Sequence, residues 1–196
     1  MGVKSFLRHA TKGPLGRASH HLDLATLEER LAALPAPPKD VGSLALVVAR
    51  GRGSRRETPK DVHLTPEDGV PGDLWKQDDG RPDSQLAVMR VDVATLIANG
   101  QALSLFGDNL LLDLDLSAAN LPAGSRLRLG GALLEVTPEP HDGCAKFRQR
   151  FGGDALRLTA DRRFRDRHLR GIYMRVLEPG DVRVGDAIEV LSRAGA

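Results

Sequence analysis

Residues 126–137 read RLRLGGALLEVT, and this stretch is the clearest indication of the fold class. Gly130 and Gly131 separate two short runs rich in leucine and valine. A two-residue glycine turn between such runs is typical of a β-hairpin, because glycine accepts the positive φ angles of tight hairpin turns. We therefore predict two antiparallel strands, at residues 126–129 and 132–137, joined by this turn.

Short apolar runs continue on both sides of this hairpin, separated by Gly, Pro or Asp. Further strands are predicted at residues 44–49, 62–65, 85–91, 110–114, 171–177 and 187–191. Helices are predicted at residues 92–98 and 145–151, and a turn at Pro179–Gly180. Many short strands with tight turns favour a β-barrel or a β-sandwich over a doubly wound sheet. The chain has neither a GxGxxG nor a Walker loop, so a conventional nucleotide-binding fold is not indicated.

The first 40 residues form a predicted extension ahead of the strand-rich part. An apolar stripe with helical spacing lies within it, formed by Leu24, Leu27, Leu31 and Leu34. Asp23 is one candidate N-cap of this helix, and Thr26 with Glu29 has the spacing of a capping box. Prolines within residues 35–38 end the helix and form a stiff connector. The favoured interpretation is a helix packed on the main domain, and a partner-binding helix is the alternative.

The composition is that of an ordinary globular protein. Of 196 residues, 41% are hydrophobic and 28% are charged, with a formal net charge of +2. That charge is too small to indicate nucleic-acid binding by itself. No apolar run reaches the roughly 18–20 residues that span a bilayer. The basic residues 1–17 lack the apolar core of a secretory signal. We therefore expect a cytoplasmic protein with neither a nucleic-acid partner nor a membrane partner.

A single cysteine, Cys144, rules out an intramolecular disulfide and any metal cluster held by cysteines alone. It stands just before the predicted helix at residues 145–151, close to the cations Lys146 and Arg148. Neighbouring cations and a helix N-terminus both lower the pKa of a thiol, which makes it a better nucleophile and metal ligand. A buried, inert core cysteine is the alternative. His141 is either a base or, as we favour, an ordinary loop histidine.

The cysteine also opens a strongly basic segment. Residues 146–170 contain nine Lys or Arg against three Asp, a net charge of +6. One interpretation, favoured for residues 162–170, is a solvated and mobile loop. The other is an anion site beside the thiol, with Arg150 as a further member. A weaker indication of phosphate binding comes from Arg55 and Arg56, because two glycines precede them in the same predicted loop.

Several stretches, taken in order, resemble the MOSC family, the domain named after the C-terminal part of molybdenum-cofactor sulfurases. They are DGVPGD at residues 68–73, FGDNLL at 106–111, the hairpin with its flank at 122–137, GCAKF at 143–147, and two closing segments at 171–180 and 184–186. The second stretch carries Asp108 where the family usually has Glu. The resemblance covers roughly residues 44–191. Each motif alone is weak evidence for the family, and the resemblance rests on their common order and spacing.

The resemblance implies a MOSC-type β-barrel, related to the pyruvate kinase barrel domain, over residues 41–196. It implies a molybdenum cofactor (molybdopterin), which purified protein can lack, with Cys144 as catalytic residue and metal ligand. A thiolate is a soft ligand that suits such a metal. The residues expected to contact the cofactor are Cys144, Lys146, Arg148, Asn109, Asp73, Arg55 and Arg56. The implied activity is the reduction of small N-hydroxylated compounds.

The resemblance thus implies an oxidoreductase. We expect it to receive electrons from a separate donor protein, because one cysteine cannot hold an iron–sulfur cluster. The alternative is a non-catalytic carrier, in which Cys144 holds a persulfide or the cofactor for a maturation enzyme. A third interpretation is an interaction module that binds a partner through the helix at residues 24–34. The identity of the substrate and the oligomeric state stay open.

Overall fold

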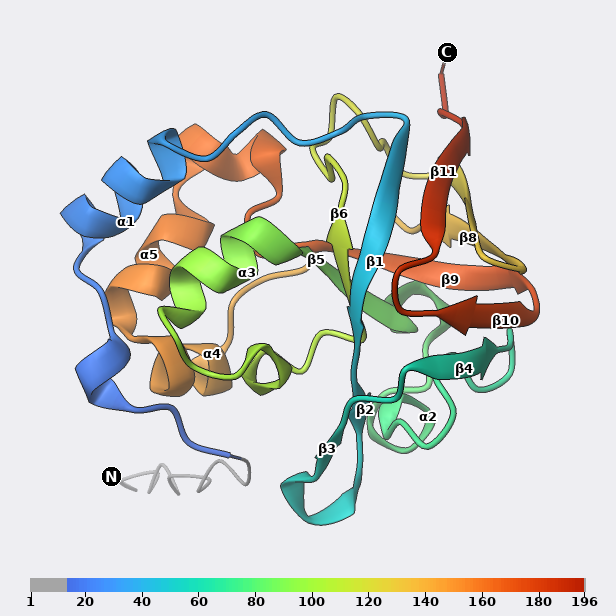
Figure 1. The fold of residues 1–196 in the computed structure, drawn as a ribbon, viewed down its shortest axis with the longest axis horizontal. Coiled ribbons are helices and arrows are strands. Elements are labelled where there is room, and N and C mark those ends of the chain that lie inside the picture. Colours follow the sequence, from blue (N-terminus) through green and yellow to red (C-terminus); the bar gives the residue numbers. More distant parts are fainter. Residues whose placement is uncertain (1–13, 196) are drawn as a thin grey trace, which may run out of the picture.

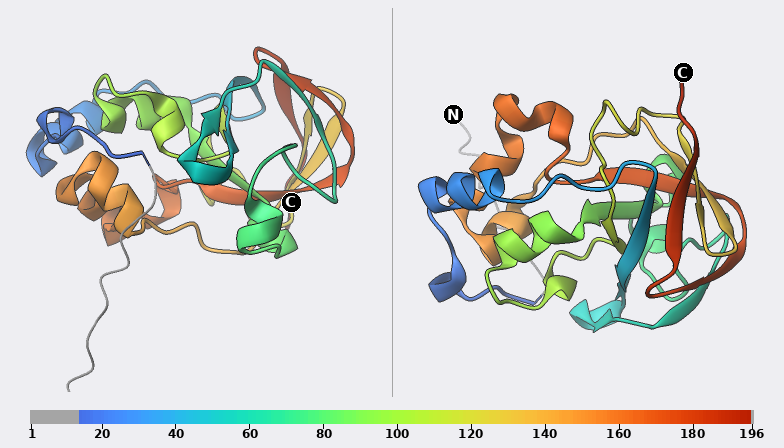
Figure 2. Two further views of the ribbon diagram at one scale, coloured as in Figure 1. Left: turned by 90° about the horizontal axis from the view of Figure 1, so that it is seen from below. Right: turned by 45° about the horizontal axis from the view of Figure 1, so that its top comes forward.

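The computed structural model describes residues 14–195 of the chain (Figure 1). A β-barrel forms one side of the molecule and a layer of helices forms the other (Figures 1 and 2). The expectation about a secretory signal falls mainly on residues 1–13, which lie outside the described part. Over residues 14–195, no helix is both long and apolar enough to cross a membrane.

Seven strands close into a barrel, in the order β1-β11-β7-β8-β9-β5-β6. They are β1 (Val41–Val47), β5 (Leu86–Arg90), β6 (Leu110–Asp113), β7 (Arg126–Leu129), β8 (Ala132–Val136), β9 (Ile172–Glu178) and β11 (Ala187–Ser192). Neighbouring strands are antiparallel except β5 and β6, which are parallel. The predicted β-barrel is confirmed, and each of these strands overlaps a predicted one.

Two short two-stranded sheets lie outside the barrel. Strand β4 (Asp61–Leu64) pairs with β10 (Gly180–Arg183), and β2 (Ala49–Arg50) pairs with β3 (Arg56–Glu57). The predicted turn at Pro179–Gly180 is wrong in one respect, because a strand already begins at Gly180. A Cβ atom on Gly180 would lie 2.1 Å from the carbonyl carbon of Gly131. Glycine is therefore required where the β7–β8 turn packs against β10.

The helical layer contains α1 (Leu24–Ala32), α3 (Val91–Ala98), α4 (Ala145–Phe151) and α5 (Gly153–Ala160). A short α2 (Trp75–Asp78) lies apart from this layer, on the side of the small sheets (Figure 1). Single 3₁₀ turns are η1 (Ala18–His20), η2 (Arg52–Ser54), η3 (Pro82–Ser84) and η4 (Leu103–Leu105), and η5 (Arg162–Arg167) is longer. The helices predicted at residues 92–98 and 145–151 are confirmed, whereas α5 was not predicted.

Two apolar cores share the central strands. On β5, Leu86 and Val88 face the barrel interior, while Met89 faces the helices. On β6, Leu110 and Leu112 face the barrel interior in the same way, and the intervening Leu111 faces the helices. Side chains alternate between the two faces of a strand, so strands that are apolar on both faces separate two buried cores.

Helix α1 packs its apolar stripe on the rest of the chain. The Asp23 carboxylate accepts a hydrogen bond from the backbone N–H of Thr26 at 2.8 Å, so Asp23 is the N-cap. Leu27 and Leu31 are only 1% and 2% exposed, in the core that α1 shares with α3 and α5. The stripe is therefore not available to a partner, which removes the feature on which the interaction-module interpretation depends.

Residues 162–170 are folded, and the interpretation as a mobile loop is wrong. Asp161 caps η5 by accepting a hydrogen bond from the backbone N–H of Arg163 at 2.9 Å. The guanidinium group of Arg163 also forms an ion pair with Glu28 on α1. Arg170 is 8% exposed and pairs with Asp108. Individual arginines thus find carboxylates from distant parts of the chain, which a count of local charge cannot reveal.

Candidate functional site

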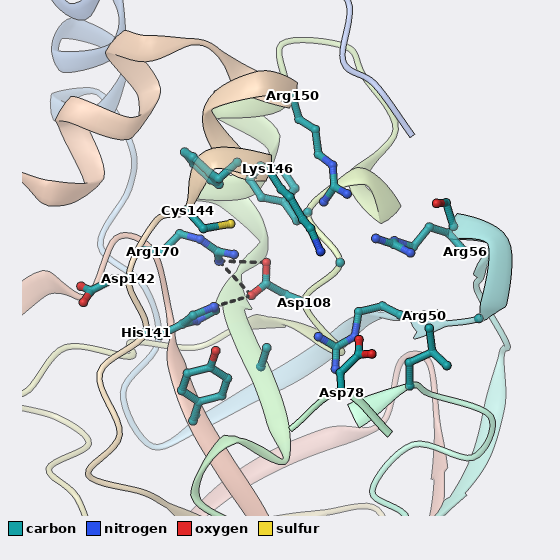
Figure 3. Close-up of a pocket in the computed structure, with 18 of the residues that line it drawn as sticks. Arg50, Arg56, Asp78, Asp108, His141, Asp142, Cys144, Lys146, Arg150 and Arg170 are labelled. Atoms are coloured by element: carbon teal, nitrogen blue, oxygen red, sulfur yellow. Dashed lines mark hydrogen bonds and ion pairs between the residues drawn. The ribbon is translucent and has the colours of Figure 1, made fainter. Parts of the chain in front are cut away.

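A cavity of about 770 Å³ lies between the β2–β3 hairpin, the loop before α4, and α4 itself (Figure 3). Cations, carboxylates and one thiol line it together. The charged and polar residues used below are Arg50, Arg56, Asp108, His141, Cys144, Lys146, Arg150, Arg170 and Tyr173. The cavity brings together the basic segment that follows Cys144 and the hairpin near Arg56, which are almost 90 residues apart.

Cys144 is the N-cap residue of α4, and its exposed side chain lines the cavity. Its sulfur atom points toward the cavity interior (Figure 3). Lys146 and Arg150 line the same cavity from α4. Residues four apart lie on one helix face, whereas a residue two positions away points to the opposite side. Lys146 and Arg150 therefore lie on one face of α4, and Cys144, whose N-cap backbone is extended rather than helical, adds its thiol to the same cavity.

Three of the cations have no carboxylate partner within the described residues. Arg56, Lys146 and Arg150 form no ion pair there, and their charged groups converge on one region of the cavity (Figure 3). Burial lowers the pKa of the Arg56 guanidinium, and repulsion by Arg150 and Arg50 lowers it further. Cations that repel each other across a cavity form a site for an anion.

Asp73 and Asn109 hold a fourth cation in place. The Asp73 carboxylate accepts three hydrogen bonds from Arg50, at 2.7 Å from its N–H, 2.9 Å from Nε and 2.6 Å from Nη2. Asn109, which is fully buried, donates from Nδ2 to Asp73 at 2.9 Å. Burial raises the pKa of Asp73, but the hydrogen bonds from Arg50 lower it more, so the carboxylate stays charged. Both residues position Arg50 and do not themselves line the cavity.

A buried network of Arg170, Asp108 and His141 forms the wall of the cavity below Cys144 (Figure 3). Arg170 donates from Nη1 to both carboxylate oxygens of Asp108, at 2.8 and 2.9 Å. His141 Nε2 lies 3.4 Å from Asp108 Oδ1, and the imidazole ring packs on Tyr173. Burial and the nearby Arg170 lower the pKa of His141 to about 3, so its ring is neutral at pH 7. His141 thus lies in a loop, as favoured, but its side chain is buried in the cavity wall.

Several buried polar atoms in this wall have no partner within the described residues. They are Nε of Arg56, Nδ1 of His141 and Nε of Arg170, and the fourth such atom, Oγ of Ser125, does not line the cavity. A buried donor without a partner costs free energy, and a bound ligand or water removes that cost. These atoms are consistent with a polar, anionic ligand in the cavity.

Besides Asp73 and Asn109, two more of the predicted contact residues lie outside the cavity. Arg148 is exposed on α4, two positions from both Lys146 and Arg150, and points away from them. Arg55 is exposed and pairs with Glu57, whereas its neighbour Arg56 turns inward. Arg55 follows η2 and lies just before β3, which begins at Arg56, so the two neighbouring side chains leave the chain in different directions.

Arg50, Asp108, His141, Arg170 and Tyr173 were not among the predicted site residues. The FGDN stretch already marked Asp108, and the four-residue spacing from Lys146 could have favoured Arg150 over Arg148. No local pattern identifies Arg170 as the partner of Asp108, because the two are 62 residues apart. These residues reach the site through barrel closure, which only the tertiary structure reveals.

Comparison with known proteins agrees with this architecture. Solved structures with the same fold include YiiM from Escherichia coli, at 24% identity and a TM-score of 0.54, covering 79% of this chain and 72% of that one. YuaD from Bacillus subtilis gives 20% identity and a TM-score of 0.53, covering 76% and 95%. A further structure, described as that of a hypothetical protein, gives 24% and 0.58, covering 79% and 69%. A search of the curated proteins found no match.

A family model identifies the domain itself. The model of the MOSC domain matches residues 74–189, which is more than half of the chain. This match includes the FGDN stretch, the β7–β8 hairpin and Cys144. MOSC domains are a family associated with binding of the molybdenum cofactor. The chain belongs to the MOSC domain family.

Proposed function

We propose that this chain binds a molybdenum–pterin cofactor in the cavity beside Cys144 and reduces N-hydroxylated compounds. One observation carries the proposal: an exposed thiol lines the same cavity as three cations that have no carboxylate partner among residues 14–195. The thiolate is a soft ligand for molybdenum. Arg56, Lys146 and Arg150 supply donors for the phosphate group of the pterin.

The residues of the cavity fit such a group in size and chemistry. A volume of about 770 Å³ is within the range of cofactor pockets. The unpartnered Nε atoms of Arg56 and Arg170 offer hydrogen bonds to an anionic ligand. When bound, the cofactor supplies the two-electron redox chemistry, and the chain supplies binding and orientation.

Buried ion pairs fix the charges at the cavity wall. Asp73 and Asp108 fix Arg50 and Arg170 at the cavity wall, and the neutral His141 adds no charge. In the proposed reaction the N–O bond of the substrate breaks. A separate donor protein supplies two electrons, and solvent supplies two protons, one for the nitrogen and one for the oxygen that leaves as water. A thiol that must stay reduced suits the proposed cytoplasmic location.

The first test uses protein from a host supplied with molybdenum. Replacing the thiol in Cys144→Ser is expected to lower both the molybdenum content and the reduction of an amidoxime to background, because the soft ligand is lost. Arg56→Gln is expected to weaken cofactor retention about tenfold, since it removes a charge-assisted donor. Elemental analysis and amidoxime turnover measure the two effects.

Arg55→Gln is the matched control, because Arg55 is the adjacent arginine on the outer side of the hairpin. It should leave both quantities unchanged. A Cys144→Ser protein that keeps its full molybdenum content and its reductase activity would contradict the proposal.

The second candidate is a carrier without catalytic activity, and the exposure of Cys144 favours it. A persulfide can pass its sulfur on only if a partner reaches it. The same preparations distinguish the candidates by intact mass. One additional sulfur on Cys144 without bound molybdenum supports the carrier, and stoichiometric molybdenum with amidoxime turnover supports the reductase.

A further inference from the structure

The segment before α1 lies against the C-terminal end of α4, the helix that carries the cavity's cations (Figure 1). Two side chains approach the backbone oxygen of Arg150: His21 Nε2 lies at 3.1 Å, and Gln101 donates from Nε2 at 3.2 Å. The last carbonyl groups of a helix lack partners within the helix. His21 therefore belongs to the C-terminal cap of α4.

The same segment also contacts the side chain of Arg150. The guanidinium group donates from Nε to the carbonyl oxygen of Pro14 at 3.2 Å and from Nη1 to that of Leu105 at 2.9 Å. Arg150 is 5% exposed, and these two neutral acceptors leave its positive charge without a carboxylate. Two hydrogen bonds to fixed carbonyls restrict a long side chain to one orientation, and Nη2 has no hydrogen bond to any residue in the described part of the chain.

The approach is close enough to exclude a side chain at one position. A Cβ atom on Gly16 would lie 1.8 Å from the carbonyl oxygen of Arg150. The backbone N–H of Arg17 donates to Gln101 Oε1 at 2.7 Å, so Gln101 bridges the segment and α4. Backbone therefore packs directly on backbone here.

Further contacts hold the segment on both sides of this junction. His20 Nδ1 lies 2.7 Å from the carbonyl oxygen of Asn99, and Asn99 Nδ2 donates to the carbonyl oxygen of His20 at 3.1 Å. Leu24 donates its N–H to Asp154 on α5 at 3.2 Å, and the buried stripe of α1 follows. The segment is thus fastened to two parts of the helical layer.

We infer that residues 14–21, which lie ahead of the matched family residues 74–189, form a working part of the anion pocket and set its affinity by positioning Arg150. This inference rests on the anion-binding part of the proposed function. Pro14, Gly16 and His21 are positioning residues, and none of them lines the cavity. The pocket is complete only with a segment outside the matched domain.

The test measures binding of inorganic phosphate to the full chain by calorimetry, beside the free energy of unfolding. Gly16→Val is expected to displace the segment and to raise the Kd for phosphate about three- to tenfold, because a charge-assisted bond is misaligned. Ala18→Val is the matched control, since Ala18 is exposed in the same segment. It should leave the Kd unchanged.

Two variants of His21 test the inference even if Gly16→Val does not fold. His21→Leu removes the nitrogen that contacts Arg150 and should weaken phosphate binding, whereas His21→Gln keeps a donor and should restore it. Unchanged affinity in both Gly16→Val and His21→Leu, with only the unfolding free energy lowered, would overturn the inference. Two other outcomes would contradict the anion pocket itself. They are a wild-type protein that does not bind phosphate, and an Arg150→Gln variant that binds phosphate as tightly as the wild type.

Discussion

At the level of single residues, Asp108 is the carboxylate that joins the buried Arg170 and His141. It is 1% exposed and accepts both hydrogen bonds from Arg170 Nη1. Burial raises the pKa of Asp108, but the charge and hydrogen bonds of Arg170 and the charge of Arg50 together lower it more, so the carboxylate stays charged. His141 remains neutral because burial first and the nearby charge of Arg170 second disfavour its protonated form more than Asp108 favours it.

The neutral His141 predicts a loss of stability in acid. Its pKa is about 3 in the folded chain against 6.5 for an ordinary histidine, so the unfolded chain binds one more proton between these pH values. The unfolding free energy should therefore fall as the pH drops from about 6.5, by up to about 1.4 kcal/mol per pH unit from this group. Urea unfolding of wild type and His141→Gln at pH 7, 5.5 and 4.5 measures it.

The variant should show the shallower dependence on pH, because its side chain does not titrate. His63→Gln is the control, since His63 is an exposed histidine paired with Asp181. It should keep the steep slope of the wild type. Equal slopes in wild type and His141→Gln would show that His141 is not held neutral.

At the level of elements, the sequence predicts the strands well and their partners poorly. The barrel strands carry apolar runs bounded by Gly, Pro or Asp, and this local pattern is enough to locate the strands in the sequence. Strand β10 pairs with β4, more than 110 residues earlier, and its first residue is a glycine that local rules assign to a turn. The same holds for the site: residues marked by local sequence are predictable, and residues placed by long-range contacts are not. Cys144, Lys146 and Arg56 were predicted, whereas Arg170 depends on a distant carboxylate.

The contact between β10 and the β7–β8 turn predicts a sensitive glycine. Gly180→Ala places a methyl group where Gly131 already lies, so the two elements must separate. We expect a loss of about 1–3 kcal/mol in the free energy of unfolding, as for overpacked core positions. Asp181→Ala, at the exposed neighbouring position, should cost less than about 1 kcal/mol. Similar losses in both variants would contradict the close contact.

At the level of the whole molecule, the two cores share β5 and β6. Met89 and Leu111 face the helices, and their neighbours face the barrel. Strands β5 and β6 contribute apolar side chains to both cores. If one layer loses its packing, it exposes one face of these two strands and destabilises the other layer as well. We therefore expect the extension, the helical layer and the barrel to unfold together.

This expectation has a direct test in Leu27→Ala, which removes a buried side chain of α1 far from the barrel. The variant should lose about 2–5 kcal/mol of unfolding free energy. Its helical circular dichroism and the fluorescence of Trp75, the only tryptophan, should still change at one denaturant midpoint. Two separate midpoints would show that α1 belongs to an independent unit.

The barrel has an odd number of strands, and this has a topological consequence. Strand directions that alternate around a closed ring require an even count, so a ring of seven must contain a parallel pair. That pair is β5 and β6, and parallel neighbours need a long crossover. Residues 91–109 form the crossover; they supply α3 to the helical layer, and near their end they bring Asp108 to the cavity wall and Asn109 to Asp73. Because the barrel has an odd number of strands, it needs this crossover, and the crossover supplies both a helix of the helical layer and part of the cavity wall.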